Sequence, residues 1–167
     1  MGDASTQGLE LEAKFRLSEV MADAPPLELR SNVSFYRSRV LSVPGPDNRL
    51  DQQPDMAINL GADYRFRAMP LTIGGNIHYT PGYDTQVSVE QTALTGSKRV
   101  FDLYALWTFK PGLALRLSVN NWLPRDYLTG GSLDFETVPN SGAFTRETSR
   151  TLTSSFTQWQ LRLEMKL

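Results

Sequence analysis

Apolar and polar residues alternate with a period of two in seven segments, and no other feature of the chain constrains its fold as strongly. Successive side chains of a β-strand point to opposite faces, so each segment predicts a strand with one apolar and one polar face. Clusters of Pro, Gly, Asn and Asp separate the segments, as is typical of connections between strands. The segments are residues 9–17, 27–39, 57–66, 71–83, 99–109, 113–123 and 157–167. The chain is therefore predicted to be all-β, an antiparallel meander of about seven strands.

The connections between these segments alternate between short and long. The short connections are residues 18–26, 67–70 and 110–112. The long connections are residues 40–56, 84–98 and 124–150, and they are rich in Gly, Pro, Asp, Asn, Ser and Thr. Every second connection of an antiparallel meander lies at the same end of the sheet. We therefore predict one end with short turns and one with long loops, an asymmetry typical of outer-membrane barrels.

Composition excludes several classes of function. The chain has 167 residues, of which 40% are hydrophobic and 21% charged, which suits one domain with either a soluble core or a membrane barrel. A net charge of −1 provides no field to attract nucleic acid. Cysteine is absent, which excludes disulfides, thiolate nucleophiles and thiolate metal sites. No apolar run approaches the length that a transmembrane helix needs.

The N-terminal stretch MGDASTQGLELEAKF lacks the basic region, apolar run and small-residue cleavage site of a secretory signal. We expect either a cytosolic protein or a chain whose true beginning lies elsewhere.

The aromatic residues of the apolar stripes favour a membrane barrel. Alternation alone also fits a soluble barrel, which points its apolar residues inward. Here the rings gather near the strand ends, and Leu, Ile, Val, Ala and Gly fill the middles, as expected for two interfacial girdles around an aliphatic band. The girdle predicted at the short-turn end is Phe15, Tyr64, Phe66, Trp107 and Phe109. The girdle predicted at the long-loop end is Phe35, Tyr79, Tyr83, Phe101 and Trp122.

One phrase, LALRLSVNNWLPRDY (residues 113–127), resembles the penultimate strand of TonB-dependent outer-membrane receptors. In that family an "l-x-v-x-N-L-hydrophobic-D/N-x-x-Y" pattern precedes a loop and the closing strand. The phrases LDQQPDMAINLGADYRF, PLTIGGNIHYTPGY and KRVFDLYALWTF are similar to the strands that come before it. The resemblance covers residues 9–167.

This resemblance implies a location and a set of partners. The family's barrels have twenty-two strands around an N-terminal plug and import scarce ligands such as ferric siderophores across the outer membrane of Gram-negative bacteria. With seven strand segments, residues 1–167 are expected to be a partial C-terminal barrel domain that lacks the plug and the N-terminal strands. The expected partners are outer-membrane lipid, the barrel-assembly machinery, the missing plug and remaining strands, and TonB only through the missing N-terminal part. Nucleic acid is not an expected partner.

Two other functions remain open at this stage. A small outer-membrane structural or pore protein could close its sheet by oligomerisation. A soluble β-barrel binding protein would show the same alternation. The fragment alone is not expected to transport.

The last segment, TQWQLRLEMKL, ends on an apolar residue without a polar tail. The closing strand of outer-membrane barrels carries the signal that the assembly machinery reads, with alternating apolar residues up to the terminus. By this resemblance the barrel-assembly signal is Leu161, Leu163, Met165 and Leu167.

The polar stripes carry no pattern typical of an enzyme. No nucleophile motif, phosphate-binding glycine loop or carboxylate pair is present, so catalysis, a cofactor and a metal site are not expected. The single histidine, His78, is predicted to face the barrel interior. The same interpretation applies to the charges of Asp63, Arg65, Asp102 and Arg116.

Two further features suggest local roles. The pair Gly74-Gly75 inside a strand predicts a bulge or a close backbone approach, such as one by a plug. Arg37, Arg39 and Arg49 are expected at the long-loop end, either solvated or against lipopolysaccharide phosphates or an anionic ligand.

Overall fold

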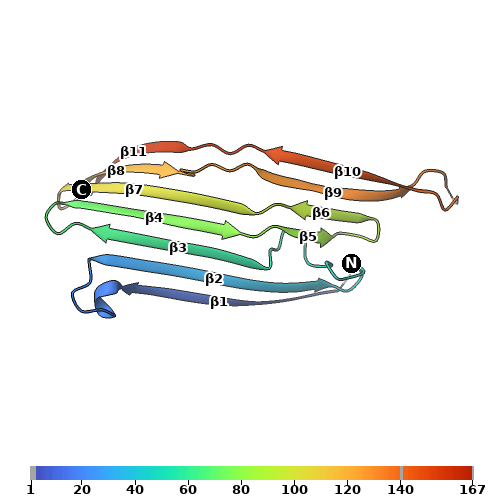
Figure 1. Cartoon of the computed structure of the whole chain (residues 1–167), viewed down its shortest axis with the longest axis horizontal. Helices are drawn as coiled ribbons and strands as arrows, with labels where there is room; N and C mark the ends of the chain where they lie inside the picture. The colour runs from blue at the N-terminus through green and yellow to red at the C-terminus, as the bar shows by residue number, and fades with distance from the viewer. Residues whose placement is uncertain (1–2, 140, 167) are drawn as a thin grey trace.

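The computed structural model describes residues 3–139 and 141–166, and it is an all-β chain with two antiparallel sheets (Figure 1). The larger sheet has seven strands in the order β1-β2-β3-β4-β7-β8-β11. Their bounds are β1 (Ala4–Arg16), β2 (Leu27–Val40), β3 (Met56–Arg65), β4 (Leu71–Thr80), β7 (Lys98–Lys110), β8 (Leu113–Asn120) and β11 (Gln158–Met165). The predicted seven-stranded meander is confirmed.

The two ends of the larger sheet differ as predicted. The short-turn end carries the connections after β1, β3 and β7, the first of which contains the 3₁₀ helix η1 (Leu17–Glu19). The long-loop end carries the longer connections (Figure 1). The described chain begins at the long-loop end, where Ala4 pairs with Val40, and ends at the short-turn end, where Met165 pairs with Leu113.

The prediction of loops at 84–98 and 124–150 was wrong. These segments form a second sheet in the order β10-β9-β6-β5, with the bounds β5 (Tyr83–Gln86), β6 (Gln91–Thr95), β9 (Tyr127–Glu136) and β10 (Phe144–Thr153). Threonine favours extended backbone, and the strand ladder needs no apolar side chains. The middle of β10 is polar on both faces and Gly130-Gly131 interrupts the pattern of β9, so neither strand gives a clear alternation signal. We call this sheet, β5, β6, β9 and β10, the extension.

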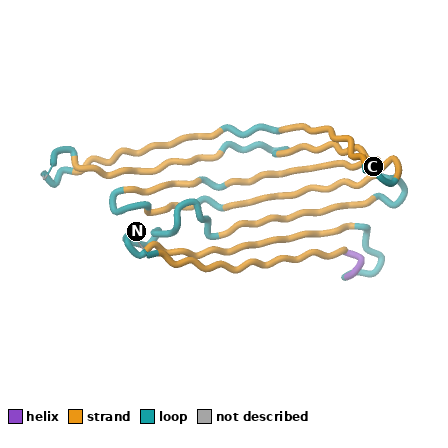
Figure 2. The backbone as a smooth tube through the Cα atoms, turned by 180° about the vertical axis from the view of Figure 1, so that it is seen from behind, coloured by secondary structure: helices purple, strands orange, loops and turns teal. Residues whose placement is uncertain are grey.

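The extension continues the strand paths of the larger sheet beyond the long-loop end (Figure 2). Breaks separate the two sheets along each path. Pro81 and Gly82 lie between β4 and β5, and Asn121 follows β8 with a φ of 52°. Asparagine tolerates this left-handed conformation better than most residues, which explains why the strand ends there although the alternation continues to residue 123.

The connection between β2 and β3, residues 41–55, is a long loop as predicted, and it packs against β5. Gln86 N–H donates to the Asp47 carbonyl over 2.7 Å. Arg49 Nη1 lies 2.6 Å from Asp55 Oδ1, and its guanidinium carbon lies 5.7 Å from the Tyr83 ring centroid. Thr85 is only 2% exposed under this loop. The loop therefore covers the edge of the extension that β5 would otherwise present.

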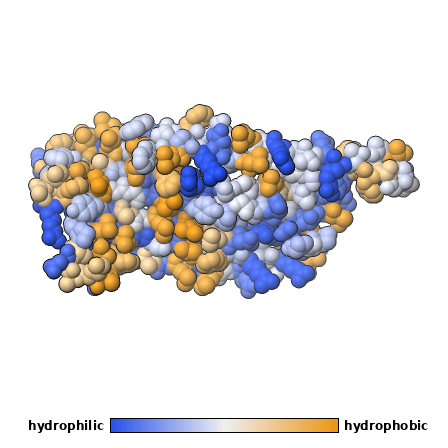
Figure 3. Space-filling model, viewed as in Figure 1, coloured by the Kyte–Doolittle hydropathy of each residue, from blue (hydrophilic) through white to orange (hydrophobic). Residues whose placement is uncertain are grey.

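Neither face of the larger sheet has a covering layer. Among the described residues the only buried hydrophobic side chains are Ala24 and Val119, whereas side chains such as Leu117 and Leu161 are exposed. In Figure 3 hydrophobic residues gather over the short-turn half of the larger sheet, and hydrophilic ones gather toward its long-loop end and over part of the extension. No helix in the described part of the chain is long and apolar enough to cross a bilayer.

Candidate functional site

The polar face of the larger sheet carries a connected row of charged and polar side chains. Arg30 Nη1 lies 2.9 Å from Asp63 Oδ2, and the Tyr104 hydroxyl donates to Asp63 Oδ1 over 2.6 Å. The Arg116 guanidinium carbon lies 4.4 Å from the Tyr104 ring centroid, and its Nε donates to Glu164 over 2.8 Å. We call these five residues the polar row.

The polar row crosses the sheet from β2 to β11 and joins residues far apart in the sequence. Exposed ion pairs contribute about 0–1 kcal/mol each, so the row adds little to the overall stability. The row favours the observed pairing register of the strands. A one-residue slip of any of these strands would move the charged side chains of that strand to the apolar face. The predictions that Asp63 and Arg116 lie on the polar face are confirmed.

Gly74 provides the space for the centre of this row. A Cβ atom at Gly74 would lie 2.5 Å from Cε1 of Tyr104 and would also collide with the Asp63 carboxylate. A glycine here therefore lets the Tyr104 ring cross over β4 and reach Asp63, which lies on the next strand. Aromatic side chains that cover strand glycines are a known device for stabilising sheets.

The interpretation of Gly74-Gly75 as a bulge was wrong. Pairing is continuous through both glycines on either side of β4, and the register shift of this region lies at Thr108–Lys110. The close approach exists, but the side chains of adjacent strands make it. At Gly75 an added Cβ would lie 2.7 Å from Leu103 Cδ2 and 3.0 Å from the Asp102 backbone carbonyl oxygen.

The other polar residues named from the sequence lie outside the row. His78 Nδ1 lies 2.6 Å from Asn59 Oδ1, and His78 Nε2 lies 3.2 Å from the Thr80 hydroxyl, so both ring nitrogens are hydrogen-bonded on the polar face. Asp102 accepts a hydrogen bond from the Asn121 backbone N–H over 2.9 Å. Arg65 is exposed at the end of β3.

The three arginines named at the long-loop end have different surroundings. Arg37 and Arg39 are exposed near the end of β2. Arg49 is paired with Asp55 at 2.6 Å and with Asp47 at 3.7 Å, and its side chain is only 17% exposed. Because two carboxylates already neutralise it, Arg49 is a poor partner for an external anion.

The predicted aromatic girdles occupy the two ends of the larger sheet, with one departure. At the short-turn end Tyr64 and Phe66 pack edge to face, with their ring centroids 4.9 Å apart. At the other end Trp122 follows β8, and its backbone N–H donates to the Phe101 carbonyl over 2.8 Å. Tyr83 is the departure, because it lies in the extension and contacts Arg49. An interfacial role for these rings stays a prediction.

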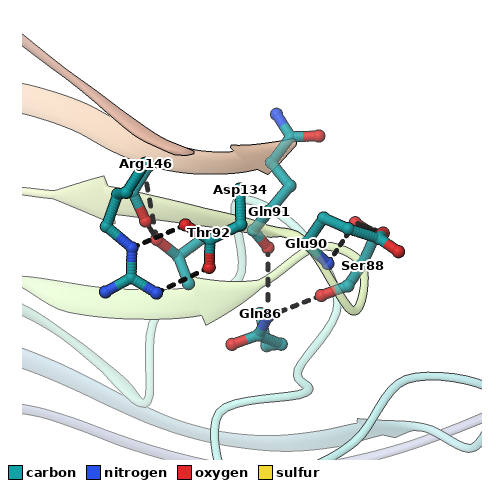
Figure 4. A network of polar contacts seen from close by, with 8 residues as sticks. Gln86, Ser88, Glu90, Gln91, Thr92, Asp134 and Arg146 are labelled. Carbon is teal, nitrogen blue, oxygen red and sulfur yellow. Dashed lines mark hydrogen bonds and ion pairs between the residues drawn. The ribbon is translucent and has the colours of Figure 1, made fainter. Parts of the chain in front are cut away.

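Polar contacts hold the extension together (Figure 4). Arg146 binds Asp134 through two hydrogen bonds of 2.6 Å, one from Nε and one from Nη2. The Thr92 and Ser132 hydroxyls lie 2.7 Å apart. Gln86 Nε2 donates to the Ser88 carbonyl at the turn between β5 and β6. The extension therefore combines polar cross-strand contacts with exposed apolar side chains such as Phe144 and Leu152.

The comparison with protein families decides the identity of this sheet. Residues 1–121 match the family model described as TonB dependent receptor-like, beta-barrel. The chain belongs to the TonB-dependent receptors. The sheet is a segment of a receptor barrel, as the resemblance implied. No curated protein and no solved structure matches the chain.

Three residues of the predicted assembly signal lie on β11. Leu161, Leu163 and Met165 of the predicted assembly signal share one face of β11, opposite Leu117, Leu115 and Leu113 of β8. All three are more than half exposed. Leu167, the fourth residue of the signal, lies outside the described residues. Recognition of these residues by the barrel-assembly machinery stays a prediction.

The polar row as a unit is not evident from the sequence. Alternation places Asp63 and Arg116 on polar stripes but indicates no role for Tyr104, Arg30 or Glu164. The signal that could have revealed the centre of the row is the register between β4 and β7, which sets Tyr104 opposite Gly74. Pairing between strands twenty or more residues apart is a tertiary property, so alternation within one strand does not contain it.

The ion pair between Asp134 and Arg146 in the extension should have a measurable effect on the titration of the Asp134 carboxyl. The hydrogen bond from Arg146 holds the pKa of the Asp134 carboxyl below its ordinary value, 3.8. The pair's contribution is therefore present above pH 3.8 and is lost as the pH falls through the lower folded-state pKa. We expect the ¹³C shift of the Asp134 carboxyl to titrate below pH 3.8 and to titrate higher in Arg146→Gln.

Arg150→Gln is the matched control, because Arg150 lies on the same strand opposite Gly130. It should leave the Asp134 midpoint unchanged. An unchanged Asp134 titration midpoint in Arg146→Gln would show that the hydrogen bond from Arg146 does not lower the pKa of Asp134.

Proposed function

We propose that this chain forms part of an outer-membrane receptor barrel that imports a scarce ligand such as a ferric siderophore. In this barrel the apolar face meets lipid, and the polar row faces the interior. The role is binding and transport, with no catalytic step. Plug, remaining strands and TonB would act together with this segment in the whole receptor.

The observation that supports this proposal best is the division of the larger sheet into two faces. One face carries the polar row, and the other carries exposed leucine and isoleucine side chains between two sets of aromatic rings. Strands of about ten residues tilted by about 45° cross the hydrocarbon layer of a bilayer. A soluble barrel would cover its apolar face, whereas lipid covers it in a membrane barrel.

Uptake of radioactive iron tests the ligand class. We expect deletion of the gene that carries these residues to abolish uptake of at least one iron-loaded siderophore by iron-starved cells of the source bacterium. Restoring the gene should restore uptake, and a protonophore should block it, because import across the outer membrane depends on energy from the inner one.

Diffusion of a small sugar through general porins serves as the control and should not change. Unaltered uptake of every siderophore in the panel would rule out a ferric siderophore as the ligand. Recovery of the protein outside the outer-membrane fraction would rule out the location.

A further inference from the structure

A cavity of about 430 Å³ lies where the larger sheet meets the extension. Its walls come from the starts of β7 and β9 and from the breaks after β8 and β10. The polar and charged residues that matter here are Lys98, Arg99, Asn121, Arg125, Tyr127 and Ser155. We call this the junction cavity.

Three cationic side chains line the junction cavity, and none of them has a carboxylate partner within the described residues. These cations are Lys98, Arg99 and Arg125, and the ion pairs of the described residues all involve other side chains. Lys98 Nζ lies 5.4 Å from the Tyr127 ring centroid, and the Arg99 guanidinium lies 4.9 Å from that of Phe101. Aromatic faces of this kind orient a cation without neutralising it.

The acidic residues near the junction cavity in the sequence are already engaged. Asp102 Oδ1 accepts from the Asn121 backbone N–H over 2.9 Å, and Asp126 Oδ1 accepts from the Ser155 N–H over 3.0 Å. Neither lines the cavity. The cavity wall is therefore positive.

Three buried polar atoms of the same wall lack a hydrogen-bond partner. They are Arg99 Nε and Ser155 Oγ, which can donate, and Asn121 Oδ1, which accepts. Buried polar groups in native proteins are almost always paired, so unpaired ones need an explanation. A ligand with acceptor oxygens for Arg99 and Ser155 and a hydroxyl for Asn121 would pair all three.

We propose that the junction cavity binds a phosphate monoester carried by a sugar. A phosphate monoester has a charge of about −1.5 to −2 near neutral pH and three acceptor oxygens, which suits three cations better than a single carboxylate does. The sugar provides the hydroxyl for Asn121. The cavity volume lies within the range of about 300–1,000 Å³ that is usual for small-ligand sites.

Two sources could supply this group. One is a phosphorylated sugar headgroup of the outer leaflet, because the cavity lies beside Phe101 at the long-loop end of the apolar band. The other is a soluble sugar phosphate. This site goes beyond the receptor's import of its ligand, and the soluble arm of the test does not depend on where the chain resides.

Calorimetry on the full chain refolded in maltoside micelles tests the proposal with glucose 6-phosphate as the probe. We expect saturable binding that Arg99→Gln weakens by about tenfold or more and Ser155→Ala by a smaller factor, since hydrogen bonds to charged groups are the stronger ones. Arg39→Gln is the matched control, because it removes one exposed charge from the same end of the sheet. It should leave binding within about twofold of the unmodified chain.

Nanodiscs distinguish the two sources. Preference for discs with monophosphoryl lipid A over discs with phosphatidylglycerol would assign the lipid headgroup, and tight binding of glucose 6-phosphate alone would assign the soluble ligand. In the unmodified chain inorganic phosphate should compete, whereas glucose should not. Absence of saturable binding by the unmodified chain, or equal losses in Arg99→Gln and Arg39→Gln, would overturn the proposal.

Discussion

Leu117→Arg is expected to destabilise the chain in phosphocholine vesicles by about 2–4 kcal/mol, the cost of an arginine near the middle of a lipid-facing strand. Leu117 lies on the apolar face of β8, between Ala105 of β7 and Leu161 of β11, and it is exposed. If that face meets lipid, the substitution places a charge in hydrocarbon. Urea unfolding followed by tryptophan fluorescence measures the change.

Ser118→Arg is the matched control for this experiment. Ser118 is the next residue along β8 and lies on the polar face, opposite Tyr104 and Gln160. The same charge there should change the free energy of unfolding by less than about 1 kcal/mol. Equal costs at both positions would show that the apolar face does not meet lipid.

Gly74→Val is expected to destabilise the chain by about 3 kcal/mol, from overpacking and from the loss of the Tyr104–Asp63 hydrogen bond. The added Cβ would lie 2.5 Å from the Tyr104 ring and would collide with the Asp63 carboxylate. The backbone of Gly74 is ordinary extended strand, so the effect would come from lost space. The same urea unfolding experiment measures it.

Two variants separate the causes. Tyr104→Phe removes the hydroxyl that donates to Asp63 and should account for about 1 kcal/mol of the loss. Gly8→Val is the control for strand glycines in general, because an added Cβ there would lie no closer than 3.3 Å to its neighbours. If Gly74→Val cost no more than Gly8→Val, the space around Gly74 would have no particular importance.

The sequence predicted the larger sheet well because each of its strands has two different surroundings. In β3, for example, Ile58, Leu60 and Ala62 alternate with Asn59, Gly61 and Asp63, and this contrast reveals both the strand and its faces. In β10 the run Thr148, Ser149, Arg150 and Thr151 is polar on both faces. The extension was therefore mistaken for loops.

The candidate sites were less predictable because they depend on register. Asp63 and Tyr104 are forty-one residues apart and meet across Gly74. The junction cavity brings together Arg99 from the start of β7, Asn121 from the break after β8 and Ser155 from the break after β10. Neither arrangement has a signature in any short stretch of sequence.

The sequence by itself determined that the chain is an antiparallel meander with one apolar and one polar face, because a strand repeats every two residues and each face needs its own kind of side chain. It also determined which end carries short turns, because connection lengths are a property of the chain. Only the tertiary structure decided how charges pair along the polar row, where Gly74 admits an aromatic ring and where unpaired cations surround a cavity. These features arise from the pairing of distant strands, and the hydrogen bonds that set this pairing join backbone groups that are the same in every residue except proline.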